Sequence, residues 1–128
     1  MKINHPLMHN NFSNSDIGAV KKLLQKKNIV LTQSKKVLEF EKKWSKWLGV
    51  KYSVFVNSGS SANLLSMLIL KSFSPKKKEV IVPSLTWVSD INSVLISGFK
   101  PVFVDINPNN LSMDENQIIK KINKNTLA

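Results

Sequence analysis

Residues 52–73 have the sequence YSVFVNSGSSANLLSMLILKSF, and this stretch decides the fold. Its first five residues are apolar, β-branched or aromatic in the main, which predicts a strand over 52–56. The strongly apolar residues 61–73 predict a helix. The junction is made of small residues, among which Ser58 can cap the helix and Gly59 allows another group to approach the backbone closely. A strand followed at once by a helix indicates an α/β fold.

The same alternation continues toward the C-terminus. Further strands are predicted over 79–82, closed by Pro83, and over 101–106, and further helices over 86–97, ended by Gly98, and over 114–123. Strands that alternate with helices predict a mostly parallel sheet flanked by helices. The last four residues, NTLA, resemble the beginning of another strand. Because so narrow a sheet is incomplete, we expect the chain to be the front part of a longer protein.

Two helices are predicted before this α/β segment. Asn14 or Ser15 can cap the first, which should end near Asn28. Ser34 can cap the second, and Gly49 stands where a left-handed helix terminus is expected.

The composition excludes several classes of protein. The 128 residues are 42% hydrophobic, enough for one packed domain, and they include no cysteine. Disulfides and thiolate catalysis are therefore excluded. No apolar run approaches the roughly 20 residues that span a bilayer, so no membrane association is expected, and a cytoplasmic location is predicted.

The formal net charge of +11 raises the alternative of a basic module that binds phosphate ligands or nucleic acid. However, all 19 basic residues are lysine, and they are spread over predicted helix faces. Arginine forks, which recognise guanine and phosphate, are absent. We therefore expect no nucleic-acid partner, although the binding module stays open as an alternative.

The turn at 57–61 is a candidate anion site. Ligands of open α/β sheets bind beyond the carboxyl ends of the strands, and this turn follows the first predicted strand. The backbone amides of Ser60 and Ser61 are expected to point outward at a helix N-terminus, which favours a phosphate. The chain has neither GxxxxGK[ST] nor GxGxxG, so a nucleotide triphosphatase and an ordinary dinucleotide fold are disfavoured. A tight capped turn with nothing bound explains the same residues equally well.

Other polar and aromatic residues give weaker indications. Trp87 begins the helix after the second strand, at the same sheet edge, where it could stack on a planar ring or simply be a packed aromatic. Asp90 is either a ligand or hydrogen-bond contact or polar surface, and Asp105 is predicted to be an acceptor in the following turn. His5 and His9 have no partnering carboxylate or third ligand, so no metal site is predicted.

In this order, the motifs resemble the N-terminal part of the sugar-nucleotide aminotransferases of the DegT/DnrJ/StrS family. The resemblance covers nearly the whole chain and rests on FEKKW…LGVKY, SGSSA in place of the family's usual Ser-Gly-Thr-Ala, EVIVPSLTW and GFKPVFVDI. It implies a fold-type I transferase that depends on pyridoxal 5′-phosphate (PLP). Residues 1–33 would then be an N-terminal arm and first helix, and residues 34–128 the beginning of the PLP-binding large domain.

The resemblance also assigns site residues and partners. It implies that Ser60 and Ser61 hold the cofactor phosphate and that Trp87 stacks on the pyridine ring. The implied substrates are a keto-sugar nucleotide, used in surface polysaccharide or amino-sugar synthesis, and an amino donor, expected to be glutamate. It further implies a homodimer.

One departure concerns activity. In the family the Schiff-base lysine and the carboxylate that pairs with the pyridine nitrogen come later than residue 128, so no catalytic residue is predicted within this chain, which should be inactive alone. The form NSGSSANLL also resembles the family branch that removes the sugar 3-hydroxyl, so a PLP-dependent 3-dehydratase is the alternative enzyme.

Overall fold

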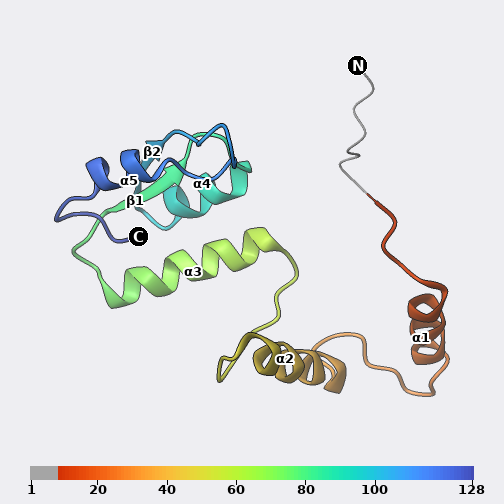
Figure 1. Ribbon diagram of the computed structural model, residues 1–128. Coiled ribbons are helices and arrows are strands. Elements are labelled where there is room, and N and C mark those ends of the chain that lie inside the picture. Colours follow the sequence, from red (N-terminus) through yellow and green to blue (C-terminus); the bar gives the residue numbers. More distant parts are fainter. Residues whose placement is uncertain (1–8) are drawn as a thin grey trace. The chain divides into compact units, whose positions relative to one another are not determined.

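The computed structural model describes residues 9–128, and the chain divides into two compact units, with the boundary in the sequence between Phe55 and Val56. Figure 1 shows helices alone before this point, and helices with strands after it. The junction lies inside residues 52–56, which have no regular secondary structure. The strand predicted there is wrong, because a strand requires a ladder partner and no described residue pairs with this segment. The predicted division of the chain into an N-terminal arm with the first helix (1–33) and the beginning of the large domain (34–128) stays a prediction.

The first unit begins with α1 (Asn14–Leu24), whose cap differs from the predicted one. Ser13, rather than Asn14 or Ser15, is the N-cap, and it forms a capping box with Asp16. The reciprocal bonds satisfy two backbone donors at once, which explains the choice of Ser13. Hydrogen bonds from the Ser13 side chain and backbone also hold the pKa of Asp16 below its ordinary value.

The second helix, α2 (Lys35–Leu48), begins and ends as predicted. The Ser34 side chain accepts from the backbone at its start, and Gly49 ends it in the left-handed region at φ 76°. Phe55 folds back onto α2, where its backbone N–H donates to Glu41 at 2.9 Å and its ring meets Phe40 edge-on. The unit is therefore held by an amphipathic helix and the segment that follows it.

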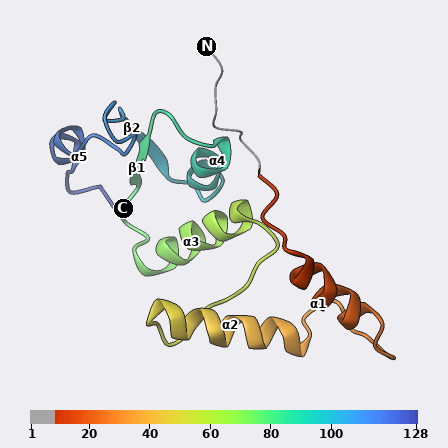
Figure 2. The ribbon, with the colours of Figure 1, turned by 45° about the vertical axis from the view of Figure 1, so that its right-hand side comes forward.

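The second unit is α/β, as predicted. Its elements in chain order are α3 (Gly59–Phe73), β1 (Glu79–Pro83), α4 (Val88–Ile96), β2 (Lys100–Val104) and α5 (Glu115–Lys121). The two strands are parallel and in register from Glu79↔Lys100 to Pro83↔Val104. Figure 2 shows α4 and α5 on opposite sides of the strands, the arrangement expected of a parallel sheet covered on both faces.

The last residues extend the sheet on the free side of β1. Thr126 forms a parallel bridge to Glu79, the Leu127 N–H donates to the Glu79 carbonyl at 2.7 Å, and the Ile81 N–H donates to the Ala128 carbonyl at 2.8 Å. The predicted strand start at NTLA is thus confirmed. A hydrogen bond from Asn123, and a weaker one from Lys100, hold the pKa of Glu79 below its ordinary value.

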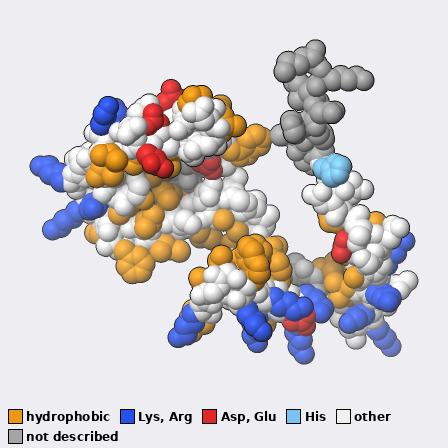
Figure 3. Space-filling view, in the orientation of Figure 1, with side chains coloured by type: hydrophobic (Ala, Val, Ile, Leu, Met, Phe, Trp, Pro, Cys, Tyr) orange, Lys and Arg blue, Asp and Glu red, His pale blue; other side chains and the backbone are white. Residues whose placement is uncertain are grey.

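The core of the second unit lies between the strands and α4. Burial alternates along β1, which places Val80 and Val82 on one face with Val94 and Phe99. Outside this cluster many large apolar side chains of the described chain are exposed, and hydrophobic side chains are visible at the surface in Figure 3. Phe73 at the end of α3 is 81% exposed.

Gly98, after α4, occupies a position that no other residue fits well. Its φ is +77°, and a Cβ added there would lie 2.9 Å from the Lys71 ammonium nitrogen. We expect Gly98→Ala to lower the free energy of unfolding by about 1–2 kcal/mol, because an L-residue is strained in this conformation. Gly18→Ala, in the open interior of α1, is the control and should be neutral or stabilising. Urea unfolding of both variants checks the difference, and equal effects would contradict it.

Candidate functional site

A cavity of about 400 Å³ lies in the second unit, between the first two turns of α3 and a face of α4 that extends from the start of that helix to Ile96. The first helix begins directly after Ser58, and the second begins after the short loop that leaves the carboxyl end of β1. The lining residues are Ser60, Ser61, Leu64, Trp87, Val88, Ser89, Asn92, Ser93 and Ile96. All three residues predicted to bind the cofactor are thus brought to one cavity.

The cap of α3 changes which amides are free. Ser58 Oγ accepts from the Ser61 N–H at 3.1 Å, as the predicted cap requires. The Ser61 amide is therefore occupied, contrary to the expectation that it would point outward, because the third helical N–H is a preferred partner of an N-cap oxygen. Among the described residues no acceptor contacts the amides of Gly59 and Ser60. These two amides are the available anion donors.

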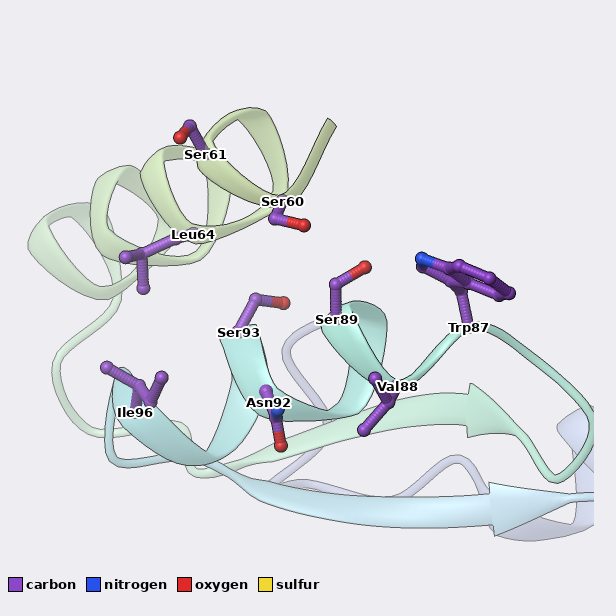
Figure 4. A pocket seen from close by; sticks show the side chains of 9 residues that line it. All are labelled: Ser60, Ser61, Leu64, Trp87, Val88, Ser89, Asn92, Ser93 and Ile96. Carbon is purple, nitrogen blue, oxygen red and sulfur yellow. The ribbon is translucent and has the colours of Figure 1, made fainter. Parts of the chain in front are cut away.

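The two serine side chains differ in the same way. Figure 4 shows the Ser60 hydroxyl on the side of α3 where Trp87 lies, whereas the Ser61 side chain points away from α4. The Ser61 hydroxyl donates to Asn57 Oδ1 at 2.7 Å and lies 3.1 Å from the Ser58 hydroxyl. Ser60 is thus the serine whose amide and hydroxyl are both available at the cavity.

Trp87 stands at the second helix N-terminus. It is the N-cap residue of α4, makes no side-chain capping bond and is 75% exposed. An aromatic ring that packs in no core and stands at the mouth of a cavity is free to stack on a ligand. The amides of Val88 and Ser89 likewise have no acceptor in the described part of the chain. Two helix N-termini therefore face one cavity.

Asp90 lies behind this cavity and joins its two walls. Asn63 Nδ2, on α3, donates to Asp90 Oδ1 at 2.6 Å, and the Thr86 hydroxyl donates to the other carboxylate oxygen. Of the two interpretations of Asp90, the structure confirms the hydrogen-bond contact. The role of Asn63 was missed by sequence reasoning, because partners 27 residues apart leave no periodic pattern.

Asp105 does not line the cavity. Its Oδ1 accepts from its neighbour Ile106 N–H at 2.8 Å and from the Ser84 hydroxyl at 3.1 Å. The side chain predicted to be the acceptor of the turn at 107–110 is therefore the wrong one: Asn107 Oδ1 accepts from the Asn109 N–H at 2.9 Å, because it lies inside the turn whereas Asp105 precedes it. Among residues 9–128 no group of three or more metal-ligating side chains comes together, and His5 lies outside the described residues. No described helix is both long and apolar enough to cross a membrane.

The cavity is electrically simple. None of its nine lining residues carries a charge, so an anion there would be held by backbone amides, hydroxyls and helix dipoles. The exposed indole adds a flat apolar surface, and Leu64 and Ile96 make the cavity apolar along the helices. This arrangement can hold a phosphate attached to a planar ring, whereas it offers no acid or base of its own.

Comparison with known proteins gives a consistent result. The model of the DegT/DnrJ/EryC1/StrS aminotransferase family matches residues 10–128. A GDP-4-keto-6-deoxy-D-mannose 3-dehydratase of Yersinia pseudotuberculosis is 32% identical, over 98% of this chain and 33% of its own length. A UDP-4-amino-4,6-dideoxy-N-acetyl-beta-L-altrosamine transaminase of Campylobacter jejuni is 37% identical, over 92% of this chain and 30% of its own.

Solved structures agree. Helicobacter pylori PseC, an aminotransferase of pseudoaminic acid biosynthesis, superposes with a TM-score of 0.78 at 36% identity, over 90% of this chain and 30% of that one. The Escherichia coli GDP-4-keto-6-deoxy-D-mannose-3-dehydratase, solved with hydrated PLP, gives 0.81 at 29% identity, over 98% and 33%. The chain spans about a third of the length of these relatives.

The match in sequence extends over most of the chain, and the helices and parallel strands correspond to part of the fold-type I PLP-dependent enzymes. The chain belongs to the DegT/DnrJ/EryC1/StrS aminotransferase family.

Proposed function

We propose that the cavity between α3 and α4 binds PLP, with the phosphate at the start of α3 and the pyridine ring against Trp87. The observation that carries the proposal is the convergence of three features on one cavity. These are the free amide of Ser60, with that of Gly59 next to it in the chain, the available Ser60 hydroxyl and the exposed indole. A phosphate uses the first two and a planar ring the third.

The cavity fits the cofactor in size and chemistry. Its volume of about 400 Å³ falls in the range of small-ligand sites, roughly 300–1,000 Å³. The phosphate needs several donors, which the amides and hydroxyl supply without a lysine. Ser61 then has a different part from the one implied by the family: its amide completes the cap and its hydroxyl ties the turn to Asn57. To bind the phosphate, this hydroxyl would have to turn away from Asn57 and donate to a phosphate oxygen.

When bound, PLP supplies an electron-withdrawing ring that accepts the electron pair of a bond broken at the substrate carbon. The residues of this chain bind and orient the cofactor: Ser60 fixes its phosphate, and Trp87 covers one ring face. None of the lining residues has an acidic or basic side chain that would serve as a general acid or base. The proton transfers and the covalent attachment of PLP therefore need groups other than these nine.

We propose an aminotransferase that acts on a keto-sugar nucleotide with glutamate as amino donor, working as a homodimer in the cytoplasm. Support comes from the relatives, which include the altrosamine transaminase of C. jejuni and a GDP-perosamine synthase of Caulobacter vibrioides that is 37% identical over 72% of this chain.

A sugar-nucleotide 3-dehydratase is the second candidate. Two 3-dehydratases, from Yersinia pseudotuberculosis and Escherichia coli, are each 32% identical over 98% of this chain. Both candidates need the same PLP site. Incubation of the protein expressed from its own gene with keto-sugar nucleotide and glutamate separates them, because an aminotransferase forms an amino sugar and a dehydratase forms a deoxy sugar.

Ser60→Asp tests the phosphate position in the protein expressed from its own gene. The new carboxylate would stand where the phosphate binds, so we expect PLP affinity to fall by about 100-fold or more, since like charges at close range in a poorly solvated site repel strongly. Binding of pyridoxal, which lacks the phosphate, should change little. PLP absorbance titration measures both.

Ser66→Asp, further along α3 and outside the cavity lining, introduces the same charge as a control. It should leave the affinity for PLP within about twofold of the unmodified protein, because an exposed charge two turns away is screened by solvent. Equal losses in the two variants, or equal losses of PLP and pyridoxal, would contradict a phosphate site at Ser60.

A further inference from the structure

We infer that Asn63 and Asp90 are positioning residues that set the separation between Ser60 and Trp87, and so the fit of the cofactor. This inference rests on the proposed PLP site. Neither residue lines the cavity, yet their side chains form a direct hydrogen bond between its two walls, Asn63 Nδ2 to Asp90 Oδ1 at 2.6 Å. The pair is partly shielded from solvent, which makes the bond stronger than an exposed one.

The spacing along each helix places the pair directly behind the two binding groups. Asn63 follows Ser60 by three residues, and Asp90 follows Trp87 by three, so each lies on the same side of its helix one turn further on. A change in the Asn63–Asp90 contact would therefore move the first turns, on which the phosphate donors and the indole are carried.

The second carboxylate oxygen of Asp90 extends the connection to the loop. It accepts from the Thr86 hydroxyl, and Thr86 is the residue immediately before Trp87. Trp87 makes no side-chain capping bond to α4. Asp90 is the acidic residue in the first turn of this helix, where the helix dipole favours a negative charge. One carboxylate thus joins α3, the loop after β1 and α4.

A second, remote link joins the same two helices. Lys71 Nζ, near the end of α3, donates to the Ser97 carbonyl at the end of α4, at 2.6 Å. It lies eight residues beyond Asn63, or about 12 Å along the helix. Lys71 therefore holds the helix pair together away from the cavity and serves as a matched control: its loss should weaken packing without changing the spacing of Ser60 and Trp87.

The test exchanges the amide of Asn63 and the carboxylate of Asp90 between the two positions. Asn63→Asp alone sets two carboxylates against each other, and we expect PLP affinity to fall about tenfold or more. Adding Asp90→Asn restores a complete set of bonds, because the amide introduced at position 90 can donate to the new carboxylate and accept from Thr86. The double variant should bind PLP within about threefold of the unmodified protein. PLP titration and urea unfolding are measured for every variant, all made in the protein expressed from its own gene.

Lys71→Met should lower the urea midpoint and leave the affinity for PLP unchanged. Unchanged PLP binding in Asn63→Asp, failure of the double variant to recover, or a loss in Lys71→Met equal to that in Asn63→Asp would each overturn the positioning role. Failure of the PLP site itself gives a different result: the unmodified protein would not bind PLP, or Ser60→Asp would bind it normally.

Discussion

Trp87→Ala is expected to weaken PLP binding by about 5- to 150-fold, which corresponds to roughly 1–3 kcal/mol of lost stacking, by analogy with bases stacked on aromatic side chains. The fold should remain intact, because this indole is 75% exposed and packs in no core of the described residues. The absorbance of bound PLP should also shift, since the ring loses its neighbour. Titration of the purified protein with PLP measures both effects.

Two further variants test whether the loss of affinity comes from the aromatic face at position 87. Trp87→Phe should retain most of the affinity because it keeps an aromatic face. Trp47→Ala removes a tryptophan of nearly equal exposure, 74%, from α2 and should leave PLP binding unchanged. If Trp87→Ala binds PLP as tightly as the unmodified protein, the indole does not stack on the cofactor.

Phe99→Ala is expected to lower the free energy of unfolding by about 3–5 kcal/mol. Phe99 is only 6% exposed and packs with Val80, Val82 and Val94, so its truncation removes apolar contacts and leaves a cavity between α4 and the strands. The loss is a large fraction of the stability of an ordinary domain, about 5–15 kcal/mol. Urea unfolding followed by far-ultraviolet circular dichroism measures it.

Phe73→Ala removes the same atoms from a side chain that is 81% exposed. It should change the free energy of unfolding by no more than about 0.5 kcal/mol, as is usual for surface substitutions. Similar losses from the two phenylalanines would show that the packing around Phe99 does not form the core of the second unit.

The local elements of this protein could be predicted because their causes are local. Ser34, Ser58 and Gly49 mark helix ends through their own side chains or backbone freedom, and all three act as predicted. The error at α1 is of the same local kind: Ser13 competes with Asn14 and Ser15 for one capping position, and only Ser13 has Asp16 three residues later to complete the box.

The strand predicted over 52–56 failed for a different reason. Its apolar, aromatic residues have strand propensity, but strand structure also needs a partner, and none of the described residues supplies one. By contrast β1 and β2 pair with each other, and the weak NTLA pattern became a strand start because Glu79 and Ile81 offered it hydrogen bonds.

The sequence by itself determined the α/β class, the family and the three residues that lie at the cavity. These could be predicted because capped turns, hydrophobic periodicity and the order of motifs depend on residues that are close together in the chain. Only the tertiary structure decided which donors are free. The Ser58 cap occupies the amide of Ser61 and leaves that of Ser60, and Asn63 meets Asp90 across 27 residues. The physical reason is that hydrogen-bond partners are chosen by distance in space, which a linear pattern does not contain.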